Sequence, residues 1–232
     1  MIRWVPPGPY EVAFSTRVGG VSEGPYASLN LGRLSGDDVD RVDENRRRLC
    51  AEIGATPDRL ALNRQVHSAL VHRAQAGDRG APGDGLWTEE VDVPLLALTA
   101  DCLPVALARI GGEAPAVAVL HAGWRGLLGG IVAEGVRAVG GRLHAAVGPA
   151  IGPCCYEVGA EVAEPFAAAF GREVVRGRHL DLWSAAERAL TDAGVERVER
   201  IDLCTHCNPE LFFSHRRTGE PRGGQGVMAR VA

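Results

Sequence analysis

The central stretch of the chain, residues 93–130, constrains the fold more than any other part of the sequence. It holds two apolar runs, Val93–Ala100 and Pro115–Leu120. Both are short, continuous and bounded by turn-forming residues, which is typical of buried strands. Cys102 follows the first run and His121 follows the second. A site residue after each of two core strands predicts an α/β protein with its functional site at the strand ends.

The segment after His121 is expected to bind an anion. Its sequence is Ala-Gly-Trp-Arg-Gly, and apolar residues at helical spacing continue over Leu127–Val139. A helix that begins at a glycine-rich turn leaves unpaired backbone N–H groups and a partial positive charge there. Arg125 lies in the same turn and offers a guanidinium fork.

Composition and charge exclude several classes of protein. The 232 residues are 46% hydrophobic and 23% charged, as in globular proteins, and the net charge of −4 gives no reason to expect nucleic acid or an anionic membrane as partner. The start of the chain lacks a signal-peptide pattern, and no apolar run approaches the roughly 18–20 residues that span a bilayer. We therefore expect a cytoplasmic protein whose six cysteines are thiols or metal ligands.

Periodicity and breakers predict the remaining elements, and we find no linker or internal repeat, so residues 1–232 are predicted to form one domain. Asp78–Asp84 is expected to be a glycine- and proline-rich loop ending in an Asp84-Gly85 turn, and residues 148–156 are expected to be irregular. Strands are predicted at Glu11–Thr16, Leu60–Val66, Leu70–Arg73, Leu143–Val147 and Arg200–Leu203, and helices at Asp40–Ile53, Gly159–Phe170 and Leu182–Ala193.

The most promising metal-binding set is His67, Cys102 and His121. Each lies at or near the end of a predicted strand, so three strands can direct them to one point. Two imidazoles and a thiolate suit Zn²⁺ and leave a fourth position open for water or substrate. The residues alone equally allow two core histidines and a buried thiol.

The same residues also allow a Cys–His hydrolase. In this alternative Cys102 is the nucleophile, His121 is the base and Asp101 orients the imidazole. Adjacent residues of a continuing strand point to opposite faces, which weakens a shared site for Asp101 and Cys102.

Four other cysteines allow a second metal site. Cys204 and Cys207 have the spacing of half a zinc site, and the chain has no second C-x-x-C to complete it. Cys154 and Cys155 are one candidate for the other half. Free thiols, buried or partly exposed, are the alternative.

Two motif searches are negative. The H-x-E and P-C-x-x-C signature of zinc nucleobase deaminases is absent. The chain has no H-x-H pair, and its seven histidines are too few for a blue multicopper centre, which disfavours laccase chemistry.

Read together, several motifs resemble the YfiH-type family, also called the laccase-domain or multicopper polyphenol oxidase family. The resemblance covers almost the whole chain, and its order of motifs is highly specific. The motifs are Phe14-Ser-Thr-Arg17-Val-Gly-Gly-Val-Ser, Ser28-Leu-Asn30-Leu-Gly, Gln65-Val-His67, Thr99-Ala-Asp-Cys102-Leu-Pro, His121-Ala-Gly-Trp-Arg125-Gly, Gly148-Pro-Ala-Ile-Gly-Pro-Cys-Cys-Tyr156 and Phe212-Phe-Ser-His-Arg216-Arg.

The resemblance implies a single-domain layered α/β sandwich of mixed sheets with a metal at His67, Cys102 and His121. Zinc is the expected metal, with copper as the alternative. The implied activity is phosphorolysis of adenosine, inosine, guanosine and methylthioadenosine to base and ribose 1-phosphate, together with adenosine deaminase activity. Nucleoside and phosphate are then the partners, with no obligate protein partner. Some members are instead linked to editing of peptidoglycan precursors, and the oxidase label conflicts with the missing copper ligands.

Within these motifs we expect Arg17, Asn30, Gln65, Arg125 and Arg216 to bind nucleoside and phosphate. The chain departs from the family pattern at three places. Ser68 stands where glycine is usual, and His215 stands where tyrosine is usual. A Gly-Gly-Gln-Gly segment replaces a usual Gly-Arg near the end, and Arg222 is a candidate to supply the lost anion contact.

Overall fold

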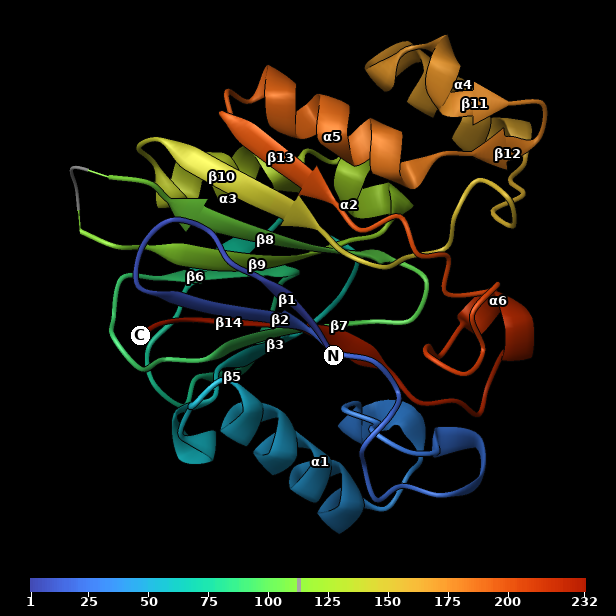
Figure 1. The fold of residues 1–232 in the computed structure, drawn as a ribbon. Helices are drawn as coiled ribbons and strands as arrows, with labels where there is room; N and C mark the ends of the chain where they lie inside the picture. The colour runs from blue at the N-terminus through green and yellow to red at the C-terminus, as the bar shows by residue number, and fades with distance from the viewer. Residues whose placement is uncertain (112–113) are drawn as a thin grey trace.

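Two β-sheets packed face to face form the centre of the molecule, and helices cover both outer faces (Figure 1). The computed structural model describes residues 1–111 and 114–232; residues 112 and 113, in the predicted connection between the two central strands, lie outside this part. The resulting order of layers is helices, six-stranded sheet, four-stranded sheet and helix. This is the mixed α/β sandwich predicted from the sequence. The assignment of residues 1–232 to one domain stays a prediction.

The six-stranded sheet has the order β13-β10-β8-β9-β6-β4. Its central pair, β8 and β9, is antiparallel, whereas the edge pairs β10–β13 and β4–β6 are parallel. The strands are β4 (Val71–Arg73), β6 (Gly85–Thr88), β8 (Leu103–Arg109), β9 (Val117–Ala122), β10 (Leu143–Val147) and β13 (Arg197–Arg200).

The four-stranded sheet has the order β1-β2-β14-β7, and all its pairs are antiparallel. Two small two-stranded sheets, β3–β5 and β11–β12, lie outside it. The strands are β1 (Ile2–Trp4), β2 (Tyr10–Phe14), β3 (Leu62–Arg64), β5 (Arg79–Pro82), β7 (Leu95–Thr99), β11 (Val175–Arg176), β12 (His179–Leu180) and β14 (Gln225–Val231).

Helices α2 to α5 cover the free face of the six-stranded sheet, and α1 covers the four-stranded sheet (Figure 1). The Asp38 side chain caps α1 by accepting hydrogen bonds from the N–H groups of Asp40 and Arg41. The helices are α1 (Val39–Glu52), α2 (Trp124–Leu128), α3 (Ile131–Val139), α4 (Ala160–Phe170), α5 (Leu182–Asp192) and α6 (His215–Thr218), with 3₁₀ turns at Gly24–Tyr26, Arg33–Ser35, Pro57–Arg59 and Arg172–Val174.

The alternation of side chains along β8 explains why its sequence is apolar up to its last residue, the buried Arg109. Val105 and Leu107 face the helices, whereas Ala106 and Ala108 face the second sheet. Because both faces of the strand are buried, apolar residues are favoured on both. The small alanines allow the two sheets to pack closely.

The structure corrects four of the predicted elements. Residues 103–109 form a strand that the sequence analysis does not predict, and β5 lies in the predicted loop Asp78–Asp84. The predicted helix Leu127–Val139 is divided into α2 and α3 at Gly130, whose φ of 87° favours glycine. The last predicted strand, Arg200–Leu203, instead ends at residue 200. No helix of the described residues is long and apolar enough to cross a membrane.

Candidate metal centre and active site

His67, Cys102 and His121 meet at one point although they come from three distant segments. Their ligand atoms all lie within 4.8 Å of one another. The two imidazole rings are nearly perpendicular, with centroids 4.9 Å apart. Cys102 directly precedes β8 and His121 lies in β9, so the antiparallel pairing of these strands brings both residues together. His67 comes from a turn after β3, not from a strand.

The turn that carries His67 is held on two sides. The Gln65 side-chain amide exchanges two hydrogen bonds of 2.7 Å with the backbone of Leu98. The backbone N–H of His67 donates to Asp84 over 3.0 Å. His67 has a φ of 58°, which is unfavourable for a residue other than glycine. The surrounding hydrogen bonds therefore hold a strained backbone, as is common at functional sites.

Asp84 is the residue that organises the centre. Its side chain is fully buried, and one carboxylate oxygen accepts a hydrogen bond from His121 Nδ1 over 2.8 Å. The other oxygen accepts from the N–H groups of Val66 and Ser68 and from the Ser68 hydroxyl. With its Nδ1 proton held by Asp84, His121 directs Nε2 toward Cys102 and His67. The sequence analysis assigned Asp84 only to a turn.

The electrostatics of the centre favour a thiolate. Burial raises the pKa of Cys102, but the neighbouring His121 and a hydrogen bond from His67 outweigh it and lower the pKa to about 6. Burial lowers the pKa of His121, whereas Cys102 and Asp84 raise it to about 9. Burial also opposes the charge on Asp84, yet its hydrogen bonds hold the pKa well below the usual range.

Asp101 does not orient His121, so that part of the hydrolase alternative is wrong. Its φ of 88° ends the strand geometry, and its carboxylate turns away from the centre. One oxygen accepts from the Thr205 hydroxyl over 2.6 Å, and the other accepts from the backbone N–H of Arg216 over 2.6 Å. Asp84 takes the place that the sequence analysis gave to Asp101.

The residues present fit a single metal ion. Two imidazole nitrogens and a sulfur in close proximity are a familiar ligand set for zinc, and His121 has the carboxylate partner that metal-binding histidines usually have. Gly123 keeps the space beside the ligands open. A Cβ atom there would lie 3.1 Å from both Cys102 Sγ and His67 Cδ2.

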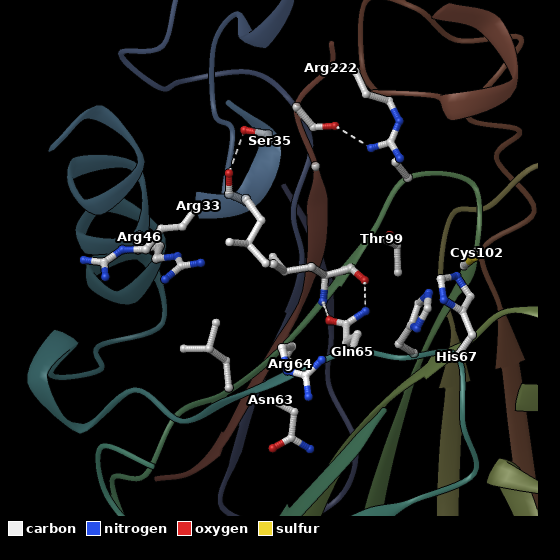
Figure 2. Close-up of a pocket in the computed structure, with 18 of the residues that line it drawn as sticks. Arg33, Ser35, Arg46, Asn63, Arg64, Gln65, His67, Thr99, Cys102 and Arg222 are labelled. Carbon is white, nitrogen blue, oxygen red and sulfur yellow. Dashed lines mark hydrogen bonds between the residues drawn. The ribbon is translucent and has the colours of Figure 1, made fainter. Parts of the chain in front are cut away.

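A cavity of about 540 Å³ opens next to this centre (Figure 2). All three ligands line it, and Thr99 lies between them and the remaining wall. The Thr99 hydroxyl is buried and has no hydrogen-bond partner among residues 1–111 and 114–232. A buried hydroxyl without a partner, on a residue that lines a cavity, is a candidate contact for a ligand.

Five arginines line the same cavity, and of these the sequence analysis named only Arg222, as a candidate anion contact. They are Arg33, Arg46, Arg64, Arg79 and Arg222. Arg33 and Arg46 already bond to the protein, and Arg222 pairs with a glutamate. Arg64 and Arg79 are exposed, and their guanidinium groups form no hydrogen bond or ion pair within the described part of the chain. For Arg64 the sequence offered an indication of a place near the site, because this residue directly precedes the Gln65-Val-His67 motif.

Three of the predicted binding residues form hydrogen bonds within the protein. Arg17 donates to the carbonyls of two loops and lies 4.5 Å over the Phe213 ring, outside the cavity wall. Asn30 is fully buried, and its amide bonds to Asp37, to Ser35 and to backbone N–H groups. Gln65 lines the cavity, but its amide is engaged with the backbone. The structure therefore gives Arg17 and Asn30 framework contacts, and their ligand contact stays a prediction.

Arg125 and Arg216 lie outside the wall of this cavity. Arg125 is exposed at the start of the short helix α2 and stacks 4.3 Å from the Trp124 ring. Arg216 lies 5.2 Å over the Tyr156 ring, and its side chain donates to the Glu157 carbonyl. Burial and the nearby Cys102 raise the pKa of Tyr156 to about 12, while both arginines oppose this rise. The positive charges of both guanidinium groups are therefore close enough to lower the pKa of the same tyrosine.

The fold and the site together define an α/β enzyme with a metal-capable His–Cys–His centre. The chain belongs to the family described as multi-copper polyphenol oxidoreductase laccase, whose model matches residues 11–232. This is the family that the motifs indicated.

Relatives from several bacteria match most of the chain. This chain is 38% identical to the purine nucleoside phosphorylase YfiH of Shigella flexneri, and the match covers 93% of this chain and 91% of the relative. This chain is also 43% identical to a purine nucleoside phosphorylase of Deinococcus radiodurans, and the match covers 91% of this chain and 85% of that relative. The crystal structure of a Neisseria meningitidis protein, 32% identical, superposes with a TM-score of 0.88 over 99% of this chain and 98% of that one.

Proposed function

We propose that this protein is a purine nucleoside phosphorylase. The substrates are adenosine, inosine, guanosine and methylthioadenosine, and the products are the free base and ribose 1-phosphate. The observation that carries the proposal is a His–Cys–His centre and free arginines on the wall of one cavity large enough for a nucleoside. The bacterial relatives, which are named purine nucleoside phosphorylases, support the same activity.

Zinc is the metal that we propose for His67, Cys102 and His121. Two imidazoles and one thiolate suit it and leave one position for a ligand, whereas copper is the alternative that the same donors also bind. When bound, the ion supplies a Lewis acid that polarises a purine nitrogen or a water molecule.

The remaining work falls to the protein's own groups. In phosphorolysis a phosphate oxygen forms a bond to C1′ of the ribose, the bond from C1′ to the purine breaks, and the base leaves with that electron pair and takes a proton. Arg64 and Arg79 bind the phosphate, because their guanidinium groups are free and form charge-assisted hydrogen bonds with it. Thr99 donates to or accepts from a substrate hydroxyl. Asp84 keeps the Nδ1 proton on His121.

The same centre supports adenosine deaminase activity. Water activated at the metal centre, and not at the phosphate position beside C1′, would be the nucleophile for C6 of the purine, and ammonia would be the leaving group. Adenosine therefore gives two sets of products, adenine with ribose 1-phosphate and inosine with ammonia. The ratio of adenine to inosine should rise with phosphate concentration.

The test is turnover of inosine with and without phosphate, measured as hypoxanthine and ribose 1-phosphate. We expect phosphate-dependent product from the zinc-loaded protein and none from His67→Ala. His144→Ala, a histidine on β10 outside the cavity wall, is the matched control and should retain activity. Unchanged turnover in His67→Ala, or turnover independent of phosphate, would refute the proposal. Metal analysis of the same samples distinguishes zinc from copper.

A second candidate is a Cys–His hydrolase that acts on an amide of a cell-wall precursor. The observation that favours it is that Cys102, His121 and Asp84 together have the composition of a nucleophile, base and orienting acid. A thiol alkylator that labels Cys102 in metal-loaded protein and abolishes amide cleavage would support it. Protection of Cys102 by the metal would favour the phosphorylase.

The compartment and partners stay proposals. All six cysteines are free thiols, which supports a reducing, cytoplasmic environment. We propose small molecules, nucleoside and phosphate, as the partners of the cavity.

A further inference from the structure

Four cysteines outside the active centre come together in space. Cys154 and Cys155 lie in the turn after β10, and Cys204 and Cys207 lie in the turn after β13. All four sulfur atoms lie within 4.8 Å of one another. Sγ of Cys207 is 3.3 Å from that of Cys155 and 3.6 Å from that of Cys154. This four-cysteine cluster takes no part in the proposed reaction.

Backbone contacts bring the two turns together. Ala150 and Cys204 form a parallel β-bridge, and the N–H of Thr205 donates to the Ala150 carbonyl over 2.9 Å. The N–H of Gly152 points at Cys204 Sγ over 3.3 Å. Backbone N–H groups directed at sulfur favour a thiolate and are a common feature around sulfur-ligated metals.

We propose that Cys154, Cys155, Cys204 and Cys207 bind one structural zinc ion as a tetrahedral four-thiolate site. Zinc–sulfur bonds of about 2.3 Å place the sulfurs of such a site roughly 3.8 Å apart. The separations in the four-cysteine cluster need only small side-chain rotations to reach this value. Four protein ligands close the coordination shell, which is the pattern of structural and not catalytic zinc.

A single ion fits the four-cysteine cluster better than an iron–sulfur cluster. Sulfurs that bind different irons of a polynuclear cluster lie farther apart than sulfurs that share one ion. The four sulfurs here lie close enough to share one. Two of them, Cys154 and Cys207, are exposed, so the ion can enter from solvent.

The ion would link the two turns that hold Asp101 next to the active centre. Asp101, the neighbour of Cys102, is held from both turns that carry the four-cysteine cluster. The N–H of Ile151 donates to its carbonyl over 3.0 Å, and the Thr205 hydroxyl donates to its carboxylate. Loss of the ion should therefore loosen the turn that positions Cys102. This role does not depend on which reaction the active centre performs.

The test measures the metal content of protein purified with a reductant. We expect one zinc ion to remain in His67→Ala, in which the active centre has lost a ligand. With Co²⁺ in place of zinc, that variant should show the intense sulfur-to-cobalt charge-transfer band and the red ligand-field bands of a four-thiolate site. Cys207→Ser should lose the ion and both spectral features. Cys50→Ala is the matched control, because Cys50 is buried beside Met228 in another part of the core, and it should change neither.

Four results would overturn the proposal. The first is a zinc-free His67→Ala protein that retains its fold by circular dichroism. The second is reduced, folded wild-type protein that releases no zinc when a mercurial reagent titrates its thiols. The third is iron in place of zinc at the four-cysteine cluster. The mercurial titration uses the wild-type chain, so the test holds even where Cys207→Ser does not fold. A Cys155–Cys207 disulfide in zinc-free native protein, found by mass spectrometry, would also contradict it.

Discussion

Asp84→Asn is the substitution that tests the metal centre most directly. The carboxylate accepts hydrogen bonds from His121 Nδ1, from three backbone N–H groups and from the Ser68 hydroxyl. An asparagine replaces one acceptor oxygen by an NH₂ group, so whichever way the amide is turned, two N–H donors lose their acceptor. An unsatisfied buried donor costs about 1–3 kcal/mol, so we expect the free energy of unfolding to fall by about 2–5 kcal/mol.

The same change should weaken metal binding. Loss of the carboxylate partner of a metal-binding histidine typically costs 10–100-fold in affinity, or about 1.4–2.8 kcal/mol. Urea denaturation of the metal-free protein gives the first quantity, and competition with a chromophoric zinc chelator gives the second. Ser68→Ala is the graded control. It removes the hydroxyl's hydrogen bond to Asp84 and the longer, exposed one that it accepts from the Leu70 N–H, and it leaves the charge, so it should cost about 1–2 kcal/mol and change zinc affinity only slightly.

The reasoning is refuted if folded Asp84→Asn protein binds zinc as tightly as the wild type. That result would mean that the strands alone place His121 and that the carboxylate contributes nothing to the ligand geometry.

Three further predictions follow from the same geometry. Gly123→Ala places a methyl group 3.1 Å from Cys102 Sγ, so zinc affinity should fall while the melting temperature changes little; unchanged affinity in a chelator competition would show that the ligands move aside without cost. Arg64→Ala and Arg79→Ala should each raise KM for phosphate more than KM for inosine, and an increase confined to inosine would assign them to the nucleoside instead. Between pH 6 and 9 the metal-free protein holds Cys102 as thiolate and His121 as imidazolium, so zinc binding should release about one proton. Zinc affinity should therefore rise about tenfold per pH unit between pH 6 and 9, because His121 must lose its proton to bind, and should fall more steeply below about pH 6, where Cys102 is protonated as well. Calorimetry in buffers of different ionisation enthalpy measures the number of protons released.

Much of the fold was readable in the sequence because the core strands and helices are strongly patterned. The strand at Leu143–Val147 was predicted with its observed ends. The helix predicted at Gly159–Phe170 begins one residue later, at Ala160, and ends as predicted. The pattern failed at β8, whose apolar residues continue directly from the Cys102 motif, and at β5, a fully exposed strand that contains glycine and proline. An exposed edge strand of this composition has no hydrophobic alternation to reveal it.

The chemistry of His67, Cys102 and His121 made them a candidate metal triad, the family resemblance favoured it, and the structure brings the three side chains together, but their surroundings were not predicted. Asp84 appeared only as a turn residue, since its role depends on a hydrogen bond to a histidine 37 positions away. Asp101 stood next to Cys102 in the chain and still turned away from it, because a positive φ redirects its side chain.

The sequence by itself therefore determined which residue types were available for the site and which segments form buried strands, since local periodicity and side-chain chemistry are properties of the chain. Only the tertiary structure decided which carboxylate orients the imidazole, which arginines face the cavity and which cysteines meet. These depend on strand pairing and on backbone angles at single residues, and neither leaves a local signal in the sequence.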